Sequence, residues 1–444
     1  MTYPSLDAYQ QVFGMACLVS RAADYKGSQD ELQQQLQHEL SFYLNNVPSV
    51  AVLGQMTSSA ADASVTPVLG SWDLVWGPAV FENNQDNIAD NAVFVARCEA
   101  VAFPGGPVLP AYVVAIAATN PDSLYDWGSE DFAVSQVVDW NTYTPSDVTP
   151  STYNNTDPYI SKGTATGVGI LLGLTTPATA AAPDTTLQQF LTGLEPDPGT
   201  AIIFCGHSLA GALSPTLALY LKEQKALEAF GVTLVYPTAG PTPGDVNFAN
   251  RFNSAFPSLP SGWQPPAQAL PYQSWNTMHW NTYDVVPHAW QKEDLQMVAN
   301  LYGASPNFKT LALLQGLQLY ALRDAAKSGA PYTRIRNSSL PGSLQYSDGS
   351  KPLNVPPQSM KDYVTQLFLQ HVSLYSGIKA DGDIPAVTGL ILPQPLPPPA
   401  LTDIVPGVTK IGTSAMVERI STRIVSGIAL HALSDAKPVA EEKA

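Results

Sequence analysis

The sequence around Ser208 runs Ala201-Ile-Ile-Phe-Cys-Gly-His-Ser-Leu-Ala-Gly-Ala-Leu213. Its apolar start, residues 201–205, has the length of a buried strand and is too short for a helix. Residues 212–221 have a helical pattern, so the serine lies in a tight turn between strand and helix. Such a turn holds the hydroxyl at the end of a sheet, as in the nucleophile elbow Gly-x-Ser-x-Gly, here with Ala210 as the second small residue. The pattern predicts a nucleophilic serine; the alternative is an ordinary turn serine.

Length and composition indicate a large globular protein. The 444 residues exceed what one core usually supports, so insertions or a second unit are expected. The 21 basic and 37 acidic residues give a net charge of −16, and 45% of the chain is hydrophobic. Such an acidic chain is not expected to bind nucleic acid through phosphate contacts. Cys17, Cys98 and Cys205 lie in apolar segments, which predicts buried free thiols rather than disulfides.

The N-terminal residues do not resemble a signal peptide. They lack the basic start and apolar core of a signal peptide. No run of about 18 apolar residues predicts a transmembrane helix. We therefore expect a cytoplasmic protein, or one exported by a signal-independent route.

Strands and helices alternate along most of the chain. The predicted strands are residues 49–57, 72–77, 92–103, 111–118, 201–205, 231–236 and a segment ending near 283. The predicted helices are residues 5–22, 29–44, 185–194, 212–221, 245–255, 291–301, 308–328 and 358–376. This order predicts an α/β fold with a doubly wound, mostly parallel sheet. Helix 308–328 is apolar around most of its circumference, so we expect it to be buried or to cover a pocket.

A nucleophilic serine requires a base and a carboxylate that orients the base. In a sheet with a nucleophile elbow, the acid follows the serine in the chain. Asp284 ends a predicted strand in Trp280-Asn-Thr-Tyr-Asp-Val-Val-Pro287 and is the predicted acid. Asp245 is the rival, but its place before a predicted helix favours a helix cap.

The base is expected downstream of the acid. His288 follows Asp284 by only four residues, too near to come from a separate loop, and His431 lies in the C-terminal tail. His371, in the last well-patterned helix, is therefore the predicted base.

Four segments together resemble the class 3 lipases, the fungal-type triacylglycerol lipase family. They are Gly206-His-Ser-Leu-Ala-Gly-Ala-Leu213, Thr238-Ala-Gly-Pro-Thr-Pro-Gly-Asp-Val-Asn-Phe248, Asn281-Thr-Tyr-Asp-Val-Val-Pro287 and His371-Val-Ser-Leu-Tyr375. They are similar to the family's Gly-His-Ser-Leu-Gly-Gly-Ala-Leu, Thr-Phe-Gly-x-Pro-x-x-Gly-x-x-x-Phe, Asn-x-x-Asp-x-Val-Pro and His-x-x-Tyr. The last segment has one extra residue. The resemblance covers about residues 90–377.

The resemblance implies an α/β-hydrolase fold and a Ser208-Asp284-His371 triad that needs no cofactor and no metal. It implies oxyanion-hole donors at Leu209 and at Thr119, although Ala117-Ala118 stand where the family has Arg-Gly. It also implies a lid over about residues 121–132, including Leu124 and Trp127.

Domain boundaries follow from these assignments. Residues 1–380 are the expected catalytic domain, with insertions at about 133–160, 257–275 and 290–330. Residues 381–444 comprise a Pro-rich segment, an amphipathic helix at 413–433 and a disordered end. The amphipathic helix would dock on the domain or contact a membrane surface or a second copy.

Three functions agree with the sequence. The first is a lipase for acylglycerols, with transient contact to a lipid interface. The second is an esterase for soluble short-chain or aromatic esters of the feruloyl type. The third is a hydrolase-fold binding protein without activity, for which the Ala117-Ala118 departure is the support.

Overall fold

Seven strands of the computed structural model form the central sheet, in the order β1-β2-β3-β6-β7-β9-β11. The structure describes residues 6–47, 69–83, 87–117, 120, 133–347, 352–376 and 389–392. The strands are β1 (Asp73–Phe81), β2 (Asn91–Ala102), β3 (Val108–Ile116), β6 (Ala201–His207), β7 (Val232–Thr238), β9 (Met278–Asn281) and β11 (Asn337–Leu340). β1, β2 and β3 pair antiparallel, and all pairs from β3 to β11 are parallel. The predicted α/β fold with a mostly parallel sheet is confirmed.

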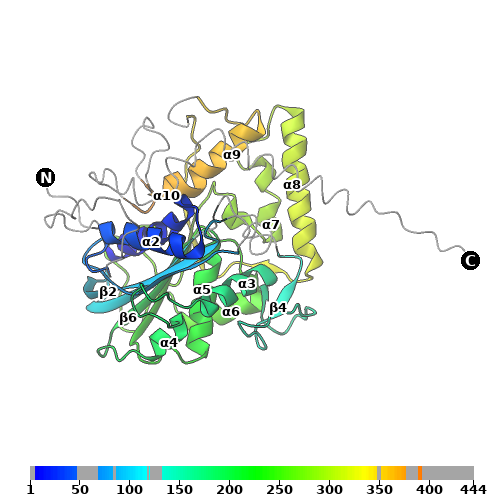
Figure 1. Cartoon of the computed structure of the whole chain (residues 1–444). Coiled ribbons are helices and arrows are strands. Elements are labelled where there is room, and N and C mark those ends of the chain that lie inside the picture. The colour runs from blue at the N-terminus through cyan, green and yellow to red at the C-terminus, as the bar shows by residue number, and fades with distance from the viewer. Residues whose placement is uncertain are drawn as a thin grey trace, which may run out of the picture.

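Helices cover both faces of this sheet (Figure 1). α1 (Ala8–Val19) and α2 (Gln29–Tyr43) lie on one face, and α3 (Lys162–Gly173), α5 (Leu209–Glu223) and α6 (Val246–Ala255) lie on the other. Successive residues of β6 alternate between them: Ile203 packs in the core with α1, while Ile202 and Phe204 pack in the core with α5. A strand buried on both faces reads as a continuous apolar run, and this is why β6 was recognisable from sequence.

A second, smaller sheet lies outside the predicted elements. It is antiparallel, in the order β10-β8-β5-β4. Its strands are β4 (Val137–Asp139), β5 (Tyr159–Ser161), β8 (Gly244–Asp245) and β10 (Tyr332–Thr333). Strands of two or three residues are too short to show an alternating pattern. α3 was also missed, because its four glycines lower its helix propensity while its Ser161 cap and buried packing stabilise it.

The remaining helices are α4 (Leu187–Thr192), α7 (Lys292–Leu295), α8 (Phe308–Lys327), α9 (Met360–Phe368) and α10 (Leu374–Ser376). A π-helical turn, Leu369–Ser373, joins α9 to α10, so the predicted helix 358–376 is broken by one wider turn. α7, α8 and α9 gather beyond one end of the central sheet (Figure 1).

Of the two expectations for helix 308–328, burial is wrong, and the cover over a pocket stays a prediction. α8 buries only Thr310, Leu314, Asp324 and Ala325, and Phe308 and Leu319 are 82% and 66% exposed. A helix that packs through one narrow stripe buries few of its apolar side chains fully, and here the leucines other than Leu314 and Leu319 are half-buried. None of the described helices is both long and apolar enough to cross a membrane.

Several predicted elements lie outside the described residues. They are the strand 49–57, the lid 121–132 with Leu124 and Trp127, the oxyanion residue Thr119, and the amphipathic helix 413–433.

Candidate active site

Ser208 lies between β6 and α5 in a strained backbone conformation. Its φ of 60° and ψ of −130° are rare for a residue with a side chain, and its N–H donates to the Thr238 carbonyl at 3.1 Å. Gly211 allows the close approach of α5 to β7, because a Cβ there would lie 2.5 Å from the Thr238 carbonyl oxygen. The strained turn leaves the Ser208 side chain half-buried at the end of the sheet, beside His371.

His371 comes from the π-helical turn and faces the serine. Its Nε2 lies 2.8 Å from the Ser208 Oγ, and its Nδ1 lies 2.8 Å from Oδ2 and 3.0 Å from Oδ1 of Asp284. These contacts form one line from the serine hydroxyl through the imidazole to a carboxylate. The structure therefore brings together the three residues that the sequence assigned to one site.

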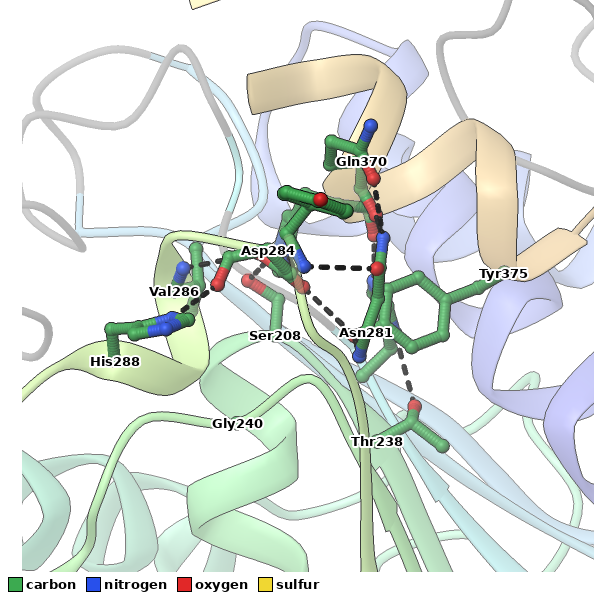
Figure 2. Close-up of polar contacts among 12 residues, drawn as sticks. Ser208, Thr238, Gly240, Asn281, Asp284, Val286, His288, Gln370 and Tyr375 are labelled. Atoms are coloured by element: carbon green, nitrogen blue, oxygen red, sulfur yellow. Dashed lines mark hydrogen bonds and ion pairs between the residues drawn. The ribbon is translucent and has the colours of Figure 1, made fainter. Parts of the chain in front are cut away.

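Asp284 is fully buried in the turn that follows β9 (Figure 2). Its Oδ1 accepts a hydrogen bond from the Val286 N–H at 3.0 Å, and its Oδ2 accepts one from the Tyr375 hydroxyl at 2.9 Å. A buried carboxylate needs such donors, because an unpaired one would lose its hydration without compensation.

His207 is a second imidazole beside the predicted base. Burial, and then the charge of His371, lower the pKa of His207 well below its usual value, so it carries a single N–H. Its Nε2 lies 2.8 Å from the His371 carbonyl oxygen, which can only accept. The proton is therefore on Nε2, and Nδ1 accepts from the Thr238 hydroxyl at 3.0 Å. This chain of hydrogen bonds, from Thr238 through His207, fixes the position of the His371 backbone.

The rival residues have other partners. The Asp245 Oδ1 accepts from the backbone N–H groups of Tyr159 and Phe248, both at 2.9 Å, so it caps α6 as predicted. His288 is buried and its Nδ1 donates to the Asp284 backbone carbonyl at 2.6 Å, whereas His371 meets the carboxylate.

Sequence reasoning assigned no role to His207, Asn281 or Tyr375, which support the site. All three stand inside motifs quoted above, and this was the available signal. Their contacts join segments more than 85 residues apart, so local pattern does not reveal them.

The first turn of α5 offers backbone donors near Ser208. Leu209 is the first residue of that helix, and the leading N–H groups of a helix have no partner within it. The positive end of the helix dipole also points to this place. The second predicted donor, Thr119, is outside the described residues; its neighbour Asn120 is buried, and its side chain donates to the Ala89 carbonyl at 2.8 Å.

The described part of the chain holds no group of three or more His, Cys, Asp or Glu side chains that could bind a metal ion. Cys17, Cys98 and Cys205 are buried free thiols, as predicted. Burial raises the pKa of Cys17 to about 12 and that of Cys205 well above its usual value, so neither thiol is a nucleophile at neutral pH.

Comparisons with known proteins agree with this geometry. Residues 133–293 match the family model for lipase (class 3). This segment contains Ser208 and Asp284, and it includes residues 133–160, where the sequence placed an insertion. A search of curated proteins found no match.

Among solved structures, the chain is similar to M37 lipase. The identity is 22% and the TM-score 0.56, over 82% of this chain and 92% of that one. A lipase from Rhizopus microsporus var. chinensis gives 12% identity and a TM-score of 0.32, over 64% of this chain and 70% of that one. Lipase II from Rhizopus niveus gives 12% and 0.34, over 64% and 75%. The M37 lipase similarity supports the α/β-hydrolase fold.

Proposed function

The chain belongs to the class 3 lipase family through residues 133–293, and on this premise we propose that it hydrolyses carboxylic esters with Ser208 as nucleophile, His371 as base and Asp284 as orienting acid. One observation carries the proposal: the Ser208 hydroxyl, at a strained and half-buried turn, hydrogen-bonds an imidazole that in turn bonds a buried carboxylate. This is the arrangement that nucleophilic acyl transfer requires.

The proposed reaction has two halves. His371 Nε2 takes the proton of Ser208 as Oγ attacks the ester carbonyl carbon, and the imidazolium then protonates the departing alcohol. Water, deprotonated by the same nitrogen, attacks the acyl carbon. The bond from that carbon to Ser208 Oγ then breaks, the imidazolium returns its proton to Oγ, and the carboxylic acid leaves. Asp284 keeps the Nδ1–H tautomer and stabilises the imidazolium in both halves.

During the attack, negative charge develops on the carbonyl oxygen of the ester, and hydrogen-bond donors must stabilise it. We propose the Leu209 N–H for one of them, at the N-terminus of α5, and the Thr119 N–H for the second. A single donor of this kind typically contributes about 3–4 kcal/mol to the transition state.

We propose acylglycerols as the substrate class, with contact to the lipid surface that presents them. The family membership supports this choice, and the exposed apolar side chains Met297, Phe308 and Leu319 are surface of the kind a lipid aggregate can cover. Soluble short-chain or aromatic esters are the alternative substrates. They are compatible with the same three residues.

A panel of chromogenic esters with increasing acyl length tests both the catalytic residues and the substrate class. We expect wild type to prefer long chains, and Ser208→Ala and His371→Ala each to lower turnover at least about a thousandfold, because the three residues act as a unit. His288→Ala is the comparison, since it removes a buried imidazole that bonds only the backbone of Asp284 among its described partners. It should lose stability and keep turnover within about tenfold.

Preference for short or aromatic acyl groups would give an esterase. If His371→Ala kept its activity while His288→Ala lost it, the base would be wrong. A wild type as inactive as Ser208→Ala on every ester would indicate a binding protein.

A further inference from the structure

Tyr375 is the buried residue that connects the acid to the neighbouring backbone. Its hydroxyl lies 2.9 Å from Asp284 Oδ2 and 2.6 Å from the backbone nitrogen of Asn281. The side chain has no exposed surface, so water does not compete for these bonds. Figure 2 shows the ring reaching from its helix toward the Asn281–Asp284 turn.

The direction of these bonds is determined by chemistry. The Asn281 N–H can only donate, so it occupies a lone pair of the phenol oxygen. The single phenol proton is then free for the carboxylate. Burial, and then the charge of Asp284, raise the pKa of Tyr375 well above its usual value, so the hydroxyl keeps this proton over the working range of the protein.

The π-helical turn places His371 and Tyr375 on the same carboxylate. Its five residues make a wider turn than an α-helix, and the two side chains, four positions apart, both reach Asp284 Oδ2. Side chains from other segments also hydrogen-bond to the backbone of this turn. The Asn281 side chain donates to the Gln370 carbonyl at 2.9 Å, and His207 donates to the His371 carbonyl at 2.8 Å.

We propose that Tyr375 is a positioning residue for the reaction: it fixes the orientation of the Asp284 carboxylate and withdraws part of its charge, and so sets how strongly Asp284 holds the His371 imidazolium. This role rests on the proposed function. Rotation of the carboxylate would break the bonds from Tyr375 and His371 together, so each stabilises the geometry of the other.

Tyr375→Phe removes one hydroxyl and keeps the ring. The substitution breaks the bond to Asp284 and also leaves the Asn281 N–H without this acceptor. From the loss of the hydrogen bond to the charged carboxylate we expect kcat to fall about ten- to a hundredfold, with KM within about twofold. Without the hydrogen bond from Tyr375, the Asp284 carboxylate keeps its full negative charge and stabilises the His371 imidazolium more strongly. The acid limb of the kcat/KM profile should therefore move to higher pH by roughly half a unit or more.

Tyr363→Phe is the matched control. Tyr363 is also buried, in the adjoining helix α9, and its hydroxyl donates to the Val298 carbonyl at 2.8 Å. Its variant should lose similar stability while the pH profile stays in place. A role through Asp284 also predicts non-additivity: in the Asp284→Asn background, Tyr375→Phe should change kcat by no more than about twofold.

An unshifted acid limb in Tyr375→Phe, or the same fold loss with and without Asp284→Asn, would overturn the positioning role. Ser208→Ala, measured beside these variants, separates that failure from failure of the proposed function. If Ser208→Ala is inactive and Tyr375→Phe behaves as wild type, only the role of Tyr375 is wrong.

Discussion

Two buried aspartates, Asp284 and Asp245, show how partners determine the role of a residue. Asp284 receives an imidazole, a phenol and one backbone N–H, so its carboxylate points into the reacting line. Asp245 receives two backbone N–H groups on Oδ1 and has no partner on Oδ2 among the described residues. The first set can stabilise a cation that forms during a reaction, and the second stabilises a strand and a helix start.

Exchange of each carboxylate for an amide should therefore separate turnover from stability. Asp284→Asn should fold and lose most of its turnover, because an amide there favours the wrong imidazole tautomer. Asp245→Asn keeps the acceptor but buries an amide nitrogen without a partner, which should cost about 1–3 kcal/mol of unfolding free energy at unchanged turnover. Denaturant unfolding and ester assays on both variants check this. The reverse pattern in turnover would move the acid to Asp245.

Asp245 also allows a prediction about how stability depends on pH. Burial raises the pKa of Asp245 above its usual value, so the folded protein binds this proton more tightly than the unfolded chain. The resulting stability is complete below the unfolded pKa, about 4, and is lost as the pH rises through the folded pKa. Asp245→Asn has no such proton. The stability advantage of wild type over Asp245→Asn should therefore shrink as the pH rises from about 4, and a constant difference in denaturant midpoints would contradict it.

At the scale of elements, the packing of α5 against β7 determines where Ser208 lies. Gly211→Ala would place a Cβ 2.5 Å from the Thr238 carbonyl oxygen and 2.7 Å from the Gly240 Cα, and both are backbone atoms that cannot rotate away. The helix must shift, which should cost about 1–3 kcal/mol and reduce turnover as Ser208 moves.

Gly316→Ala, in the middle of α8, is the comparison, because nothing lies within 4 Å of its Cβ position. It should gain about 0.5–1 kcal/mol from helix propensity and leave turnover unchanged. Thermal unfolding and one ester assay measure both variants. Equal effects of the two substitutions would mean that α5 can adjust without moving the serine.

Elements differ in how well sequence predicted them, for physical reasons. β6 and β7 are apolar runs buried on both faces, and the caps of α2 and α6 are local bonds between residues three apart, so short windows contain the signal. β10, β11 and the π-helical turn depend on pairing or packing with distant segments. At the site, chain order and strand ends were enough to select Ser208, Asp284 and His371 for one place. The support by His207 and Tyr375 required the tertiary structure.

The whole molecule combines a buried reacting line with an apolar outer helix. Leu314 of α8 packs in one cluster with Tyr283 and Val285, the neighbours of Asp284, while Phe308 and Leu319 of the same helix remain exposed. α8 stands beyond the end of the sheet beside α7 and α9 (Figure 1). A protein of net charge −16 that acts on lipid would use apolar contact rather than attraction to anionic head groups.

Activity at an interface is the property that depends on this whole arrangement. We propose, from the resemblance to class 3 lipases, a lid over about residues 121–132, with Leu124 and Trp127 on one face if the segment is helical. In water such a face should close over the acyl pocket, because exposure forfeits about 25 cal/mol per Å² of apolar area. A lipid surface supplies another apolar partner and raises the open population. We therefore expect turnover of one ester to rise above its aggregation limit, and Trp127→Ala to reduce that rise.

Phe42→Ala is the control for this experiment, since Phe42 is a half-exposed aromatic residue on α2, at 51% exposure, and belongs to neither the predicted lid nor α8. It should keep the full rise. A rise that survives Trp127→Ala but is lost in Phe308→Ser would locate the contact on α8 rather than on the lid. An activity curve that passes smoothly through the aggregation limit in wild type would contradict interfacial action altogether, because a site that is always open gains nothing from a surface.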